Sequence, residues 1–176
     1  MPLNPEIVVD MSCATGLFTR RLMKSNDYSR VIGCDYSDSM LREARKRINS
    51  DTELNDGNTN TRLDLVRCDV GNIPMISESV DAFHAGAAMH CWPDLDAALS
   101  EIHRVLKPGG RYFATTFLTD YFSGVNMVGN TVAQQKMFQE FTRDSLDDLL
   151  LTAGFEAEKF EIEILGSACV VIRAEK

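Results

Sequence analysis

Residues 6–18 read EIVVDMSCATGLF, a strand-like run that passes through an acid and a small-residue turn into a helix. Residues 7–9 suit a buried strand, Asp10 follows them, and helical spacing begins just after Gly16. Small residues in the turn let backbone N–H groups approach a ligand, and Gly16 gives the backbone freedom to turn. This order of elements is typical of the ligand-binding edge of an open α/β sheet.

The composition of the chain indicates one globular domain. Its 176 residues are 44% hydrophobic, which suits a single core. No segment approaches the length of a membrane-spanning helix, and no signal-peptide pattern opens the chain. The formal net charge is −8 and the pI is near 4.9, so a nucleic-acid backbone would be repelled overall. We therefore expect no nucleic-acid partner and no membrane span.

The five cysteines indicate a reducing compartment. They show no C-x-x-C spacing, which disfavours a zinc site and a disulfide framework. Cys13, Cys34 and Cys68 each fall near the end of a predicted strand, where we expect small, buried packing residues. The sequence thus predicts free thiols in an intracellular protein, with no metal site.

Strand and helix patterns alternate along the chain. Near-continuous apolar strands separated by helices predict a parallel sheet covered on both faces, the α/β class. The polar residues 50–61 read as a loop, and residues 158–176 as an antiparallel hairpin whose glutamates face water. The predicted strands are residues 6–13, 30–36, 62–70, 79–88 and 111–118. Predicted helices cover residues 16–25 and 95–106, with others capped by Ser37 and Ser145.

Three acids end the first three predicted strands. Ligands of open α/β sheets bind beyond these strand ends, so Asp10, Asp35 and Asp69 should lie near one another. Asp35 follows Gly16 by about twenty residues, the placement that suits a ribose diol. For Asp10 and Asp35 the alternative is that they cap loops. Asp69 is placed to accept a hydrogen bond from an adenine amino group.

The first turn discriminates between two kinds of nucleotide. A dinucleotide-binding turn carries Gly-x-Gly-x-x-Gly beneath a pyrophosphate. Here Ser12, Ala14 and Gly16 occupy the turn, and Asp10 precedes it. A carboxylate at this point repels phosphate but attracts the ammonium and sulfonium groups of S-adenosylmethionine, by ~1–4 kcal/mol at 4 Å depending on screening. The turn therefore fits a sulfonium nucleotide better than a dinucleotide.

Six segments, in order along nearly the whole chain, resemble the motifs of class I S-adenosylmethionine-dependent methyltransferases. They are VVDMSCATG (8–16), VIGCDYSDSML (31–41), DLVRCDVGNIPM (64–75), SVDAFHAGAAMHCW (79–92), ALSEIHRVLKPGGRYFATTF (98–117) and SLDDLLLTAGF (145–155). The wording HAGAAMHCW is similar to that of methyltransferases of plant plastids. The resemblance implies a doubly wound, Rossmann-like seven-stranded sheet of order 3-2-1-4-5-7-6, with the last strand antiparallel.

The resemblance also implies a donor and a set of donor-binding residues. The cofactor would be S-adenosylmethionine, with S-adenosylhomocysteine as the product. Tyr36 and Met40 would pack on one face of the adenine ring, opposite Val70. The expected cofactor-binding residues are Asp10, Met11, Ser12, Cys13, Ala14, Gly16, Asp35, Tyr36, Met40, Asp69, Val70 and Gly86.

The stretch after the fourth strand should face the transferred methyl group. His90 is the candidate catalytic base, and the alternative is that it orients the loop. His84, inside the strand, is expected in the core or the donor pocket. Trp92 either walls the acceptor pocket or packs under the next helix. Tyr121 and Phe122 are candidate acceptor-pocket residues, with ordinary core packing as the alternative.

We interpret residues 1–176 as one class I methyltransferase domain, apparently lacking the family's usual N-terminal helical lid. It would methylate a small, lipophilic metabolite in the cytoplasm, or in the plastid stroma after removal of a transit peptide. The sequence does not indicate the oligomeric state. One alternative is a methyltransferase-like protein that binds donor or a partner without catalysis, because Ser12 and Ala14 replace glycines. Another is an NAD(P)-dependent Rossmann reductase, which Asp10 and the missing glycine fingerprint disfavour.

Overall fold

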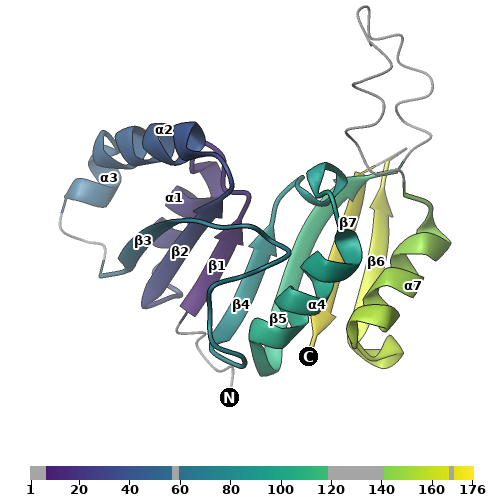
Figure 1. Ribbon diagram of the computed structural model, residues 1–176. Coiled ribbons are helices and arrows are strands. Elements are labelled where there is room, and N and C mark those ends of the chain that lie inside the picture. Colours follow the sequence, from purple (N-terminus) through teal and green to yellow (C-terminus); the bar gives the residue numbers. More distant parts are fainter. Residues whose placement is uncertain (1–6, 57–59, 119–140, 167–168) are drawn as a thin grey trace, which may run out of the picture.

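The computed structural model describes residues 7–56, 60–118, 141–166 and 169–176, built around one mixed sheet (Figure 1). The strand order is β3-β2-β1-β4-β5-β7-β6, and β7 runs antiparallel to both of its neighbours. This confirms the predicted fold class and strand order. The strands are β1 (Ile7–Met11), β2 (Arg30–Asp35), β3 (Arg62–Arg67), β4 (Val80–Ala85), β5 (Leu106–Phe117), β6 (Phe160–Leu165) and β7 (Cys169–Glu175).

The helices begin and end mostly where the sequence predicts. The Ser37 side chain accepts a hydrogen bond from the Met40 N–H, and Asp94 accepts one from Ala97. Gly154 ends the last helix with a φ of 105°. The helices are α1 (Leu17–Ser25), α2 (Asp38–Asn49), α3 (Thr52–Asn55), α4 (Leu95–Val105) and α7 (Arg143–Ala153), with short 3₁₀ turns η1 (Met89–Cys91) and η2 (Ala157–Lys159).

Two local predictions were wrong. The residues predicted as a loop at 50–61 include the short helix α3, which tertiary contacts stabilise: Lys24 pairs with Asp51, and Leu54 packs against the core. The N-cap of α7 is Thr142, not Ser145. The Thr142 hydroxyl accepts from the Ser145 N–H while the Ser145 hydroxyl accepts from the Thr142 N–H. Both hydroxyls suit a cap, so composition alone did not distinguish them.

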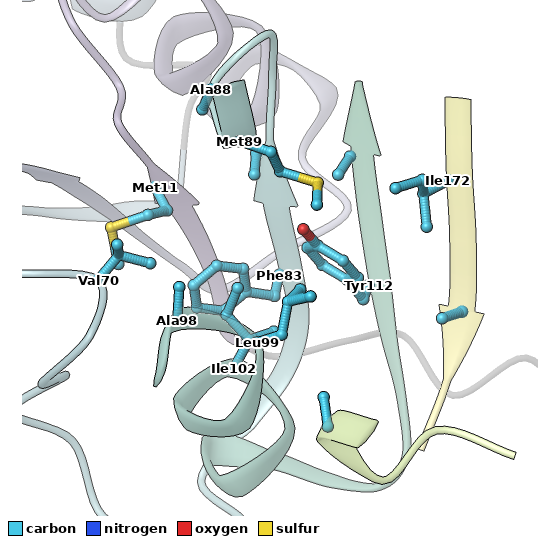
Figure 2. Packing of buried hydrophobic residues seen from close by; sticks show 14 of the residues in the cluster. Met11, Val70, Phe83, Ala88, Met89, Ala98, Leu99, Ile102, Tyr112 and Ile172 are labelled. Carbon is cyan, nitrogen blue, oxygen red and sulfur yellow. The ribbon is translucent and has the colours of Figure 1, made fainter. Parts of the chain in front are cut away.

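Alternate strand residues supply two cores on opposite faces of the sheet. Val8, Met23, Val31, Ile48 and Ala82 form the smaller core under α1 and α2. The larger core lies under α4 and α7, where Figure 2 shows Leu99 and Ile102 of α4 against Phe83 and Tyr112 of the sheet. Each such side chain contributes about 1.5–3 kcal/mol on burial. Cys13, Cys34 and Cys68 are free and buried, as the sequence predicted.

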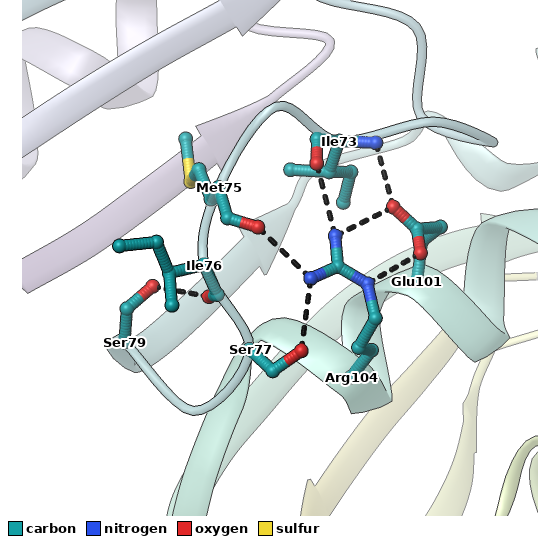
Figure 3. Close-up of polar contacts among 7 residues, drawn as sticks. All are labelled: Ile73, Met75, Ile76, Ser77, Ser79, Glu101 and Arg104. Carbon is teal, nitrogen blue, oxygen red and sulfur yellow. Dashed lines mark hydrogen bonds and ion pairs between the residues drawn. The ribbon is translucent and has the colours of Figure 1, made fainter.

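A loop, rather than a helix, connects β3 to β4. Residues 68–79 cross the α4 side of the sheet, and Val70 and Ile73 are buried against the larger core. The Arg104 guanidinium donates to the carbonyl oxygens of Ile73 and Met75, each at 2.9 Å (Figure 3). The Glu101 carboxylate binds the same guanidinium and accepts from the Ile73 N–H at 2.8 Å. Two side chains of α4 therefore fix this loop in place of helix packing.

In the described ranges, no helix has both the length and the apolar composition that a bilayer span needs.

Replacing Arg104 should loosen the β3–β4 loop. We expect Arg104→Met to lower the free energy of unfolding by about 2–3 kcal/mol, because charged hydrogen bonds to loop carbonyls are lost. Urea unfolding followed by circular dichroism measures the change. Arg45→Met, at an exposed position of α2, is the matched control. Equal unfolding midpoints for the two variants would contradict this account.

The contribution of the Glu101–Arg104 ion pair to the stability of the fold should depend on pH. The Arg104 guanidinium hydrogen-bonds Glu101 and holds the pKa of that carboxyl below its ordinary value of 4.5. A lowered carboxyl pKa stabilises the fold at pH values above the ordinary pKa, and the effect is lost as the pH falls through the lowered value. The difference between parent and Arg104→Met should therefore be full at pH 7 and shrink in acid below about pH 4.5.

Candidate functional site at the carboxyl edge of the sheet

The loop between β1 and α1 has an unusual backbone. Ser12, Ala14 and Gly16 have φ values of 57°, 48° and 75°. Side-chain-bearing residues rarely adopt this left-handed region, at a cost of about 1–3 kcal/mol each. Such a conformation persists only where neighbouring groups hold it. The loop lies at the carboxyl ends of the parallel strands, the edge where ligands of such sheets bind.

Asp35, at the end of β2, holds this loop. Its Oδ2 accepts a hydrogen bond from the Ala14 N–H and its Oδ1 accepts one from the Ser37 N–H, both at 2.8 Å. The Cys13 N–H donates to the Cys34 carbonyl oxygen at 2.9 Å. Asp35 thus caps the loop and the start of α2 together. Each half-buried carboxylate oxygen keeps capacity for a further donor.

Asp10 lies beneath the loop and does not present its carboxylate at the surface. Only 2% of the residue is exposed. Its Oδ2 accepts from the Thr19 hydroxyl at 2.5 Å, and its Oδ1 lies 2.8 Å from His84 Nδ1. This contact joins the side chains of β1 and β4 inside the sheet. The carboxylate that the sequence predicted at the ligand-binding edge is therefore enclosed by Thr19 and His84 instead of exposed there.

The side chains of Met11 and Cys13 also face the core. Both are buried, and Figure 2 shows Met11 beside Val70. Burial, reinforced by the nearby Asp10, raises the pKa of the Cys13 thiol to about 12, so this thiol stays protonated. Met11 and Cys13 can meet a ligand only through their backbone. Val70 is likewise buried.

The residues expected around an adenine ring are divided between surface and core. Asp69 is exposed, and its Oδ1 accepts from the Gly71 N–H at 2.9 Å. Tyr36 is 67% exposed, with the Arg67 guanidinium 5.4 Å from its ring centroid, and Met40 is exposed on the first turn of α2. The apolar surfaces of Tyr36 and Met40 are thus open to a ligand, next to the hydrogen-bonding groups of Asp35.

Gly86 permits a close approach after β4. A Cβ atom there would lie 2.9 Å from His84 Cε1 and 3.0 Å from the Phe18 ring. His84 lies between two rings, with centroid distances of 4.7 Å to Phe18 and 5.8 Å to Phe113. His84 is therefore a core residue that also contacts Asp10 of β1, just before the β1–α1 loop. Phe18, Phe113 and Thr19 were not singled out by the sequence.

The turn after β4 carries the predicted acceptor-side residues. His90, in η1, is half-buried, and its Nδ1 lies 3.5 Å from the Thr116 hydroxyl. Burial lowers the pKa of His90 below 6.5, so the ring is largely neutral at pH 7 and can accept a proton. Trp92 is only 4% exposed, and its Nε1–H donates to the Ser12 hydroxyl at 3.0 Å. Trp92 is therefore a buried packing residue and does not form an exposed wall of a pocket. Tyr121 and Phe122 lie outside the described residues.

A separate groove of about 520 Å³ lies where β7 ends and β6 begins. Its lining mixes cations such as Arg111 and Arg173 with glutamates, including Glu161 and Glu175. This position is at the end of the sheet away from the strand-end acids, so the groove is not the site described above. In the ranges that the structure describes, no three His, Cys, Asp or Glu side chains form a metal-binding group.

Comparisons with known proteins place the chain in a family. The family model described as "Methyltransferase domain" matches residues 9–114, more than half of the chain. Two chloroplastic proteins of Arabidopsis thaliana, both named uncharacterized methyltransferases, are 45% and 48% identical over 113 and 112 residues. A demethylmenaquinone methyltransferase of Corynebacterium kroppenstedtii is 35% identical over 118 residues, which are 67% of this chain and 44% of that protein.

Solved structures share the fold. A SAM-dependent methyltransferase from Methanosarcina mazei superposes with a TM-score of 0.79 at 19% identity, over 99% of this chain and 93% of that one. The [4+2]-cyclase SpnF superposes with a TM-score of 0.70 at 24% identity, over 89% of this chain and 54% of that one. The fold alone therefore does not determine the reaction.

The extent of the match also matters. The alignments to the two Arabidopsis proteins cover 64% of this chain but 31% of each relative, so the chain spans about a third of their length. The family match includes the small-residue loop, Asp35, Asp69 and the turn with His90 and Trp92. By this match, the chain belongs to the methyltransferase domain family.

Proposed function

We propose that this domain transfers a methyl group from S-adenosylmethionine to a small-molecule acceptor. The observation that carries the proposal is the left-handed, small-residue loop between β1 and α1, held by Asp35 at the carboxyl edge of the sheet. Membership of the methyltransferase family supports it. Asp10, behind the loop, adds a negative charge that favours a sulfonium over a phosphate.

The donor would lie across the ends of β1, β2 and β3. Asp35 would accept from the ribose hydroxyls with the capacity that Ala14 and Ser37 leave free. Asp69 would accept from the adenine amino group, and the exposed Tyr36 and Met40 would cover the ring. S-adenosylmethionine supplies an activated methyl group when it is bound.

The chain's own residues would then align the acceptor and remove its proton. Alignment in an in-line displacement lowers the barrier by up to ~7–11 kcal/mol. An electron pair of the acceptor forms the new bond to the methyl carbon while the carbon–sulfur bond breaks. The electrons of the broken bond remain on sulfur, which becomes a neutral thioether. Neutral His90 would take the acceptor's proton, an effect typically of ~10²–10⁴-fold in rate.

The acceptor in this proposal is small and lipophilic. Phe117 packs edge-on against His90 at a centroid distance of 5.5 Å, so the candidate base has an apolar neighbour. The likeness to a demethylmenaquinone methyltransferase supports an apolar acceptor. The chloroplastic names of the two Arabidopsis relatives support a plastid compartment.

A second candidate function is donor binding without methyl transfer. The similarity to a [4+2]-cyclase motivates it, because that protein shares the fold. Ser12 and Ala14, where glycine is frequent, also motivate it. The deciding experiment incubates the protein with a metabolite extract and methyl-labelled S-adenosylmethionine, followed by mass spectrometry. A labelled product that requires the protein supports transfer, whereas bound donor with no labelled product supports the second candidate.

Asp35→Ala should weaken donor binding. We expect at least a tenfold higher Kd for S-adenosylhomocysteine, because hydrogen bonds to a charged group contribute ~1.5–3 kcal/mol and 1.4 kcal/mol is tenfold. Isothermal titration calorimetry measures the Kd. Asp38→Ala, an exposed acid three residues later, is the control and should bind like the parent. If Asp35→Ala also binds like the parent, Asp35 has no part in the donor site.

His90→Ala should reduce turnover by ~10²–10⁴-fold with little change in donor affinity. In the parent, burial lowers the pKa of His90, so the neutral, basic form of the ring dominates at pH values above that lowered pKa. The rate of the parent should rise with pH through an inflection that lies below pH 6.5, and it should be constant at higher pH. The variant should lose this inflection. An unchanged rate and pH profile in His90→Ala would remove His90 from the mechanism.

A further inference from the structure

Trp92 is the one tryptophan of the sequence, and it connects two loops that are distant along the chain. It is nearly fully buried in the larger core, at the end of η1. Its indole N–H donates to the Ser12 hydroxyl at 3.0 Å, across 80 positions of sequence. An indole N–H can only donate, so the Ser12 oxygen accepts and keeps its own proton for another partner.

Ser12 occupies a sensitive point of the β1–α1 loop. Its φ of 57° is one of the left-handed values that shape the loop, and the residue is partly exposed. Asp35 fixes the far side of the loop through Ala14, at 2.8 Å. The Trp92 contact fixes the near side. The backbone at Ser12 is thus held from β2 on one side and from the segment after β4 on the other.

The same tryptophan ends the turn that carries His90. The backbone N–H of Trp92 donates to the Met89 carbonyl oxygen at 3.1 Å, and this bond completes the 3₁₀ turn η1, which contains His90. The turn is also attached to β5: the Ala87 N–H donates to the Thr115 hydroxyl at 2.8 Å, and His90 contacts Thr116. A shift at Ser12 therefore reaches His90 through one buried side chain and one hydrogen-bonded turn.

We propose that the Ser12–Trp92 hydrogen bond couples the donor loop to the His90 turn. Ser12 and Trp92 are positioning residues: a donor in the loop fixes Ser12, and Trp92 then sets His90 relative to the methyl group. Trp92 is thereby reassigned from the acceptor-pocket wall to the link between the donor and acceptor sides. The inference rests on the proposed function, because it needs a donor in this loop.

The lone tryptophan makes the coupling measurable. Adding S-adenosylhomocysteine to the parent should change the tryptophan emission and shift its indole N–H resonance. Ser12→Gly is the sharper variant, since glycine adopts positive φ without strain and the substitution removes the hydroxymethyl group that accepts the bond. It should raise the Kd for S-adenosylhomocysteine by up to about tenfold, the limit set by one net hydrogen bond that holds the binding conformation of the loop. It should also abolish most of the emission change.

A double-mutant cycle separates coupling from two independent effects. Trp92→Phe keeps an aromatic ring but removes the N–H, and calorimetry should show a similar loss of affinity. The double variant should bind within about twofold of either single variant, because both remove the same bond. Ser25→Gly, an exposed serine at the end of α1, is the control and should match the parent in affinity and emission.

The outcomes distinguish this inference from the function on which it rests. A parent that binds S-adenosylhomocysteine, with additive losses in the cycle or an unchanged emission response in Ser12→Gly, overturns the coupling alone. A parent that shows no binding of S-adenosylhomocysteine overturns the donor site and the coupling together.

Discussion

The carboxylate of Asp35 is the constraint on which the site depends. It accepts from Ala14 in the β1–α1 loop and from Ser37 at the start of α2. Ser12 and Ala14 adopt backbone conformations that side-chain-bearing residues avoid, so the loop needs an external partner to keep its shape. Asp35 supplies that partner from the end of a core strand, which pairs residue by residue with β1. The shape of the loop is therefore a property of the sheet rather than of the loop itself.

The two acids Asp35 and Asp10 differ in how deeply they are buried, and therefore in what they can contact. Asp35 is half-buried and keeps acceptor capacity for a ligand. Asp10 is enclosed, and the strand register explains its partner: Asp10 of β1 lies opposite His84 of β4, so their side chains meet at 2.8 Å. A buried carboxylate is stable only with such partners. Asp10 can thus contribute charge to the site without a direct ligand contact, and its burial depends on Thr19 and His84.

Much of the fold was predictable because it depends on local patterns. Apolar strands, the Ser37 and Asp94 caps and the buried cysteines follow from composition and spacing, while the strand order came from the resemblance to a family. The site was predictable as a set of strand ends, but its contacts were not. Neither the Trp92–Ser12 bond nor the Arg104 contacts to the β3–β4 loop has a local signal, because each joins segments far apart in sequence. Burial of Asp10 likewise requires knowing which helix face carries Thr19.

The edge of the sheet at the β1–α1 loop should accept a sulfonium nucleoside in preference to a phosphate-bearing dinucleotide. The most direct test of this preference is a pair of calorimetric titrations of the protein at pH 7, one with S-adenosylmethionine and one with NAD. The arrangement of Asp10, Asp35 and the small-residue loop predicts saturable binding of S-adenosylmethionine and no heat of binding with NAD. Saturable binding of NAD, with none of S-adenosylmethionine, would contradict this preference.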